Sequence, residues 1–142
     1  MLRIKLQYLP DIIAERQAIA KKYLENIKNP LLILPKVREN AEHVYHQFVV
    51  RVKQRDHFRE YLKRCGIETV IHYPIPPHLA GCYQSLGYKK GNFPIAEKYA
   101  GEVLSLPIFN GMTEEEIQFV IKTCCEYSYF KAGVDFYAKS GV

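Results

Sequence analysis

The sequence predicts an α+β fold, a small, mainly antiparallel sheet with helices packed on one face and a long N-terminal helical arm. Apolar residues recur at intervals of three and four over residues 1–29, which indicates the helical arm. Three stretches with strand character, around residues 43–52, 67–73 and 103–107, indicate the sheet. Amphipathic helical patterns separate them.

Length and composition predict one globular core. The chain has 142 residues, of which 48% are hydrophobic. No stretch approaches the ~20 apolar residues that cross a membrane, and the N-terminus lacks a signal-peptide pattern, so we expect a cytoplasmic protein with no membrane partner. Four cysteines without paired spacing predict reduced thiols, with Cys124 in the core of a helix.

The formal charge of +5 permits an anionic partner. The basic residues are nevertheless scattered beside acidic ones, and no recognition motif for nucleic acid occurs. We therefore expect a solvated surface and no nucleic-acid partner.

The predicted arm covers residues 1–29. Pro10 interrupts its periodicity, which predicts a kink or a break, and Asn29-Pro30 ends it. An apolar helix that begins without an N-terminal cap is typical of a piece of a longer chain. We expect the arm to pack on a further domain, residues 30–127 to form a small domain, and residues 128–142 to form a tail.

In the first strand, residues 43–52, alternation predicts Val44 and His46 on the face of Phe48, with Tyr45 on the other face. His43 and His46 would then face opposite sides, so we expect no metal site there. An amphipathic helix over residues 54–65 should end at Gly66.

Three elements are predicted after the second strand. A short helix covers residues 79–86. A second helix begins at an Asn92 cap, with Pro94 in its first turn. A capping box of Thr113 and Glu116 opens the last helix. The residues expected to be buried are Ile95, Ala96, Tyr99, Ala100 and Val103 in the second helix and Ile117, Val120, Ile121 and Cys124 in the last.

The most informative stretch is Ile71-His72-Tyr73-Pro74-Ile75-Pro76-Pro77-His78. Its prolines exclude a helix or a central strand and predict a stiff, extended loop that presents His72 and His78. Such loops aim polar groups at ligands. The alternative is that the prolines only turn a corner and the histidines are incidental surface residues.

No complete catalytic motif is present. Cys65 and Cys82 would be nucleophiles only beside a histidine in space. His57, on the polar side of its helix, is expected to be solvated. The chain therefore carries part of a site rather than a whole one.

Four stretches together resemble the C-terminal domain of the DegT/DnrJ/StrS nucleotide-sugar aminotransferases. They are Leu2–Leu9 with Glu15-Arg16, His43–Arg51, Gly66–His78, and Phe93–Glu97 through Val103–Pro107 to Met112–Glu116. The doubled proline before His78 most resembles members that aminate a 3-keto-6-deoxyhexose on dTDP. The resemblance implies the small domain of a fold-type I enzyme that uses pyridoxal 5′-phosphate, glutamate and a nucleotide-linked keto-sugar, in pathways such as O-antigen biosynthesis.

The resemblance also implies what is missing. In the family the Schiff-base lysine lies upstream of the segment matched by Leu2–Leu9, and Lys5 does not match it. The cofactor-binding residues lie there too, so we expect no catalytic residue, no metal and no bound cofactor in this chain alone. The family's substrate-side loop matches His72, Tyr73 and His78, which implies substrate contacts for these three. Alternatively, His78 caps the following helix and Tyr73 packs in the core.

Two other functions stay open. A self-sufficient interaction module would associate as a homodimer, or with a partner, through Leu2, Leu6, Leu9 and Ile13 of the arm. A nucleic-acid binder would need clustered basic residues and steep salt dependence.

Overall fold

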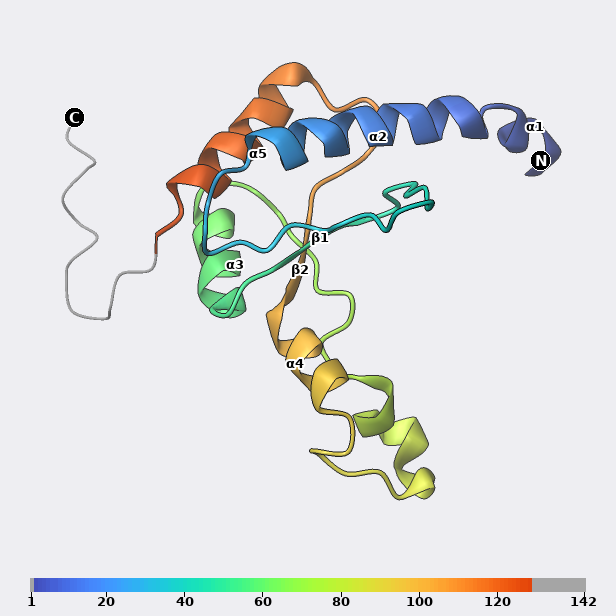
Figure 1. The fold of residues 1–142 in the computed structure, drawn as a ribbon, viewed down its shortest axis with the longest axis vertical. Coiled ribbons are helices and arrows are strands. Elements are labelled where there is room, and N and C mark those ends of the chain that lie inside the picture. Colours follow the sequence, from blue (N-terminus) through green and yellow to red (C-terminus); the bar gives the residue numbers. More distant parts are fainter. Residues whose placement is uncertain (1, 129–142) are drawn as a thin grey trace.

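A computed structural model of the chain describes residues 2–128, and Figure 1 shows their arrangement. The elements follow in the order α1 (Leu2–Gln7), α2 (Leu9–Asn26), β1 (Phe48–Arg51), α3 (Arg55–Arg64), η1 (Pro77–Leu79), η2 (Gly81–Leu86), α4 (Pro94–Glu102), β2 (Val103–Leu106) and α5 (Glu114–Glu126), where η marks a 3₁₀ helix. Helices around a small antiparallel sheet make this an α+β fold, as predicted. The tail prediction lies outside the described residues, apart from Ser128.

The N-terminal arm is broken where Pro10 predicted it. Helix α1 ends at Gln7, and α2 begins at Leu9 with Pro10 in its first turn. Only the second half of α2 enters the core, where Ile19, Ala20 and Tyr23 are buried. The first half and α1 project beyond the body of the molecule (Figure 1).

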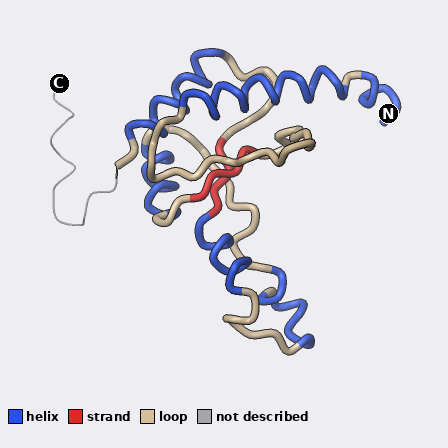
Figure 2. The backbone as a smooth tube through the Cα atoms, viewed as in Figure 1, coloured by secondary structure: helices blue, strands red, loops and turns tan. Residues whose placement is uncertain are grey.

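The sheet consists of β1 and β2, paired antiparallel with Phe48 opposite Leu106. Figure 2 shows these strands in red at the centre of the molecule. Single bridges extend the ribbon on both sides, from Ile33 to Arg51 and from Val70 to Ser105.

The first predicted strand is too long, because it begins at Phe48 and not at residue 43. Tyr45 has a positive φ of 46°, and its amide donates to Nδ1 of His43 at 2.9 Å. Arg16 Nη1 donates to the carbonyls of Tyr45 and His46 at 3.3 and 3.2 Å. Side chains thus take the backbone groups that a strand partner would need, and the turn buries Tyr45 while Val44 is exposed. The predicted faces are therefore wrong before Phe48.

The second predicted strand, residues 67–73, is reduced to one bridge. Val70 and Ser105 exchange two backbone hydrogen bonds, of 3.3 and 2.8 Å. The chain then leaves the sheet into the Pro74–Pro77 stretch, whose prolines cannot donate to a ladder. The peptide bond between His72 and Tyr73 is cis.

The remaining helices of the body form as predicted. Helix α3 ends at Arg64 with Cys65 as its C-cap, and Gly66 follows with a φ of 83°. The capping box of α5 is complete, because the Glu116 amide donates to Thr113 Oγ1 and the Thr113 amide donates to Glu116 Oε2. Helix α2 packs against α5 and α3 against β2. The fully buried side chains at the centre include Tyr23, Phe48, Phe58, Leu62, Leu104, Val50 and Cys124.

Residues 77–102, here called the distal lobe, differ most from the prediction. The expected helix over residues 79–86 is the pair of short 3₁₀ helices η1 and η2. Phe93, not Asn92, is the N-cap of α4, because the Asn92 side chain accepts a bond from the Lys89 amide in the preceding turn. The lobe extends beyond the end of the strands instead of covering the sheet (Figure 1).

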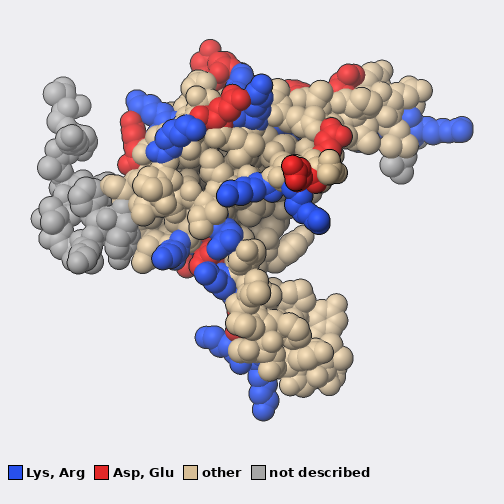
Figure 3. Space-filling view, viewed as in Figure 1, with Lys and Arg blue, Asp and Glu red and all other residues tan. Residues whose placement is uncertain are grey.

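The predicted inner face of α4 is consequently wrong. Ala100 is the only buried residue of the helix, and the Ile95 side chain is 72% exposed. In the view of Figure 3 the lobe is mostly uncharged, with lysines along one edge. On the body, cationic and acidic side chains are interspersed in that view.

Candidate functional site

The start of the proline loop is held against β2. His72 lies two residues after the bridge to Ser105, and its Nδ1 lies 2.9 Å from the Ser105 hydroxyl oxygen. Ser105 is only 6% exposed and lies on β2, so the hydroxyl that bonds His72 is buried in the sheet. A hydrogen bond to one ring nitrogen orients the imidazole and leaves Nε2 as the nitrogen that can reach a ligand.

A cavity of about 250 Å³ lies beside this pair. Its lining residues are His46, Gln47, Glu68, Thr69, Val70, His72, Ser105, Leu106, Pro107, Ile108 and Phe109. Apolar walls with a few convergent polar groups are typical of ligand sites, and here the polar groups suit hydroxyl-rich ligands. Ser105, which the sequence analysis did not single out, belongs to this site.

Tyr73 points into solvent. Its side chain is 73% exposed, and its ring stands edge-on to His72 with the ring centroids 5.6 Å apart. The alternative that Tyr73 packs in the core is therefore wrong. An exposed phenol beside an oriented imidazole can donate or accept a hydrogen bond at the loop surface.

His78 lies in a different environment. Its side chain is 7% exposed, its ring packs on Phe93 at 4.8 Å, and its Nε2 lies 3.0 Å from Oε1 of Glu97 on α4. It caps neither η1, in which it lies, nor the following η2, because neither helix has a side-chain cap. The structure thus brings His72 and Tyr73 together and holds His78 inside the distal lobe.

Glu97 is the second residue that the sequence analysis missed. Burial alone would raise the pKa of its carboxyl, but hydrogen bonds from the Gly91 amide, the His78 ring and the Phe93 amide outweigh burial and lower that pKa below its usual value. Its only signal in the sequence is an acidic residue in the first turn of a helix, and that position has an ordinary explanation in the helix dipole.

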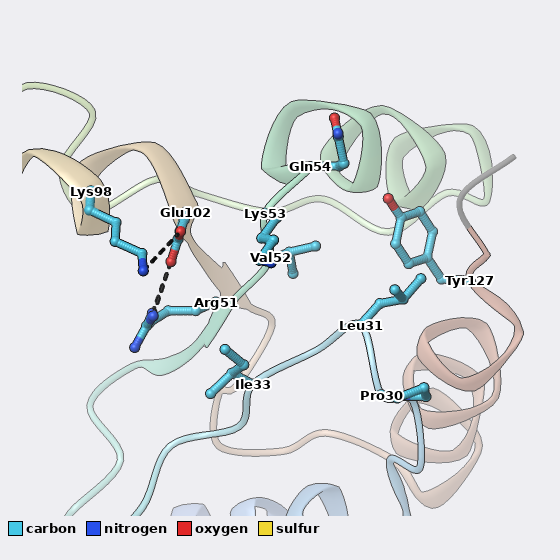
Figure 4. Close-up of a pocket in the computed structure, with 10 residues that line it drawn as sticks. All are labelled: Pro30, Leu31, Ile33, Arg51, Val52, Lys53, Gln54, Lys98, Glu102 and Tyr127. Carbon is cyan, nitrogen blue, oxygen red and sulfur yellow. Dashed lines mark hydrogen bonds and ion pairs between the residues drawn. The ribbon is translucent and has the colours of Figure 1, made fainter. Parts of the chain in front are cut away.

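A larger cavity of about 380 Å³ lies on another part of the body (Figure 4). Leu31, Ile33 and Tyr127 form part of its apolar wall. At its rim Arg51 bonds Glu102 at 3.0 Å, and Lys98 lies 4.0 Å from the same carboxylate. This cavity contains none of the predicted site residues.

Within residues 2–128, no group of three or more metal-ligating side chains gathers and no helix is long and apolar enough to span a membrane. His57 is exposed, as predicted, and its Nδ1 lies 3.0 Å from the Tyr127 hydroxyl.

Comparison with known proteins identifies the protein family of this chain. The model of the DegT/DnrJ/EryC1/StrS aminotransferase family matches residues 1–124, so the chain belongs to this family.

One curated relative and one solved structure show which members of the family this chain is similar to. A dTDP-3-amino-3,6-dideoxy-α-D-galactopyranose transaminase of Aneurinibacillus thermoaerophilus is 46% identical over 129 residues, which cover 91% of this chain and 35% of that protein. The solved structure of DesV from S. venezuelae, in complex with a ketimine intermediate, superposes with a TM-score of 0.84 at 36% identity and covers 88% of this chain and 34% of that one. The chain therefore spans about a third of the length of these relatives.

Proposed function

We propose that this chain is the substrate-side part of a pyridoxal-phosphate-dependent aminotransferase that transfers an amino group from glutamate to a nucleotide-linked keto-sugar. Membership of the aminotransferase family over residues 1–124 supports the reaction class. The names of the similar transaminases support a dTDP-linked sugar. The observation that carries the proposal is His72, oriented by Ser105 at the edge of a cavity with hydroxyl-binding groups.

The cofactor, when bound, would supply the electron sink for moving the amino group. The residues described here do not fit it. The cavity beside His72 has neither lysine nor arginine in its lining, so it offers no Schiff-base amine and no cation for a phosphate. The larger cavity is lined by two lysines. Lys53 is exposed, and the Lys98 side chain is 60% exposed and paired with Glu102, whereas a Schiff-base lysine is activated by desolvation.

This mismatch supports a chain that is inactive alone, with the cofactor-binding residues on a further domain. That domain would pack on residues 1–29, where Ile4, Leu6 and Leu9 are exposed. We also infer a homodimer and a cytoplasmic location for the whole enzyme.

In the complete site, His72 and Tyr73 bind and orient the sugar. The His72 imidazole and the Tyr73 hydroxyl can each hydrogen-bond sugar hydroxyls or phosphate oxygens in a cleft that excludes water. His78 was predicted to share this contact. Its buried ring and its bond to Glu97 favour a different role.

A chimera tests this proposal. The chain is joined to the preceding two thirds of the Aneurinibacillus transaminase, in place of the segment that it matches. We expect the chimera to aminate a dTDP-3-keto-6-deoxyhexose with glutamate and the isolated chain to be inactive. His72→Ala in the chimera should lower kcat/KM about tenfold or more, the factor expected for one hydrogen bond to substrate.

His57→Ala is the matched control, because it removes an imidazole from α3 outside the cavity lining and should leave kcat/KM unchanged. A folded, cofactor-loaded chimera that aminates no nucleotide-linked keto-sugar would refute the proposed function.

Borohydride reduction of the isolated chain in the presence of pyridoxal phosphate is a second, independent test. A single saturable lysine adduct there would mean that the chain has its own cofactor site.

A second candidate is a protein-interaction module without catalytic activity. The exposed apolar side chains of α1 and the start of α2 favour it, because such a surface promotes association through the arm. If the chimera is inactive and the isolated chain still associates through the arm, this second function is the better account.

A further inference from the structure

The distal lobe is closed by a single carboxylate oxygen. Oε1 of Glu97 accepts hydrogen bonds from the Gly91 amide at 2.7 Å and the Phe93 amide at 3.3 Å, and it lies 3.0 Å from His78 Nε2. His78 ends the proline loop, while Gly91 and Phe93 lead into α4. One oxygen atom therefore bonds to both ends of the segment from residue 78 to residue 93, here called the excursion.

Hydrophobic packing of the excursion is too sparse to substitute for the Glu97 hydrogen bonds. Every residue from 81 to 96 is exposed, and Ala100 is the only buried residue of α4. Besides the Glu97 bonds and the local bonds within its turns, such as that from the Lys89 amide to Asn92, the segment from 78 to 93 is held by ring contacts of Phe93, with His78 at 4.8 Å and with Tyr88 at 5.1 Å. A segment with so few buried contacts depends strongly on its polar bonds.

The other end of the proline loop is held by the same stretch of chain. Helix α4 runs directly into β2, and Ser105 on β2 bonds the His72 ring. The junction between them is fixed to β1, because Glu102 accepts bonds from the Arg51 guanidinium at 3.0 and 3.3 Å. The loop is thus attached at His72 and at His78 to one continuous support.

The prolines make the two attachments interdependent. Pro74, Pro76 and Pro77 have fixed φ angles, and they restrict the residues before them. A stiff connector transmits the position of one end to the other, whereas a flexible one would absorb a shift at His78. Movement at Glu97 should therefore reach His72, which Glu97 does not contact.

We propose that Glu97 is a positioning residue for the substrate-side loop: by holding His78, it fixes where the loop presents His72 and Tyr73. The inference rests on the proposed function for its biological meaning. It assigns His78 to anchoring and leaves the substrate contacts to His72 and Tyr73.

The isolated 142-residue chain suffices for the test, so its outcome does not depend on aminotransferase activity. In Glu97→Gln we expect trypsin to cleave after Lys89 and Lys90 about tenfold faster, the factor for one lost charged hydrogen bond. The decisive readout is the ring signals of His72 in ¹H–¹⁵N NMR spectra. They should shift or broaden in Glu97→Gln, while the amides of α3 and α5 stay unchanged.

Two further variants complete the test. Glu114→Gln is the matched control, because Glu114 bonds Lys22 and Gln118 on the opposite side of the body and should change neither readout. His78→Phe keeps an aromatic ring beside Phe93 but loses the nitrogen, and it should reproduce the effects of Glu97→Gln. It also serves as the second variant if Glu97→Gln does not fold.

Unchanged His72 signals in both Glu97→Gln and His78→Phe would overturn the proposal, even if cleavage at Lys89 were faster. Glu97 would then stabilise only the excursion from 78 to 93. This failure differs from failure of the proposed function, which is read from the activity of the chimera. The positioning role can fail while His72→Ala still lowers activity there.

Discussion

Burial raises the pKa of the Cys124 thiol to about 12, with a smaller contribution from the neighbouring Cys125. The thiolate is the nucleophilic form, so a buried thiol with a raised pKa reacts slowly. All four cysteines are free thiols, and Cys82 and Cys125 are exposed. The exposed thiols of Cys82 and Cys125 should therefore react quickly with alkylating reagents, and the buried thiol of Cys124 slowly.

We predict that iodoacetamide at pH 8 alkylates Cys82 and Cys125 while Cys124 stays unmodified, as measured by peptide mass mapping. In guanidinium chloride Cys124 should react as fast as the others, which shows that burial protects it. Equal labelling of Cys124 and Cys82 in the folded chain would show that α5 does not pack as described.

At the scale of the element, the capping box of α5 is a local device with a measurable effect. Thr113 and Glu116 satisfy each other's backbone amides, with bonds of 3.2 and 2.8 Å. The helix carries Ile117, Val120 and Cys124 into the core, so fraying at its start is transmitted to the packing.

Thr113→Ala should lower the free energy of unfolding by about 1 kcal/mol, the usual effect of losing a side-chain cap. Urea denaturation followed by circular dichroism measures it. Thr113→Ser keeps the hydroxyl acceptor and should remain close to the unchanged chain. A loss as large in Thr113→Ser would assign the effect to the methyl group rather than to the cap.

At the scale of the whole molecule, the arm leaves apolar surface uncovered within the described residues. Ile4, Leu6 and Leu9 are 62%, 56% and 42% exposed on α1 and the start of α2. Exposed apolar side chains of this kind favour association in water. A large-domain interface and a self-association interface both account for it.

We predict that the isolated chain associates and that the double substitution Leu6→Glu, Leu9→Glu makes it monomeric in sedimentation velocity. The unfolding midpoint should stay the same, because neither side chain belongs to the core. Gln7→Glu adds a charge to the same helix without removing an apolar side chain and should leave association intact. Association that survives the double substitution would place the contact elsewhere.

The sequence by itself determined the local elements. The break at Pro10, the end of α3 at Gly66 and the capping box at Thr113 were all predictable, because each depends on residues within one turn of helix. The family was predictable as well, since its motifs are read in order along the chain. The stiff loop followed from its prolines, whose restricted φ needs no tertiary context.

Tertiary structure alone decided the strand lengths and the partners of the site residues. The strand pattern at residues 43–47 is overridden by Arg16, which comes from α2 and takes the backbone carbonyls there. His72 pairs with Ser105 and His78 with Glu97, at separations of 33 and 19 residues. Side-chain chemistry specifies what each group can bond, but only the path of the chain brings two such groups within 3 Å, because that path is set by burial of the whole core.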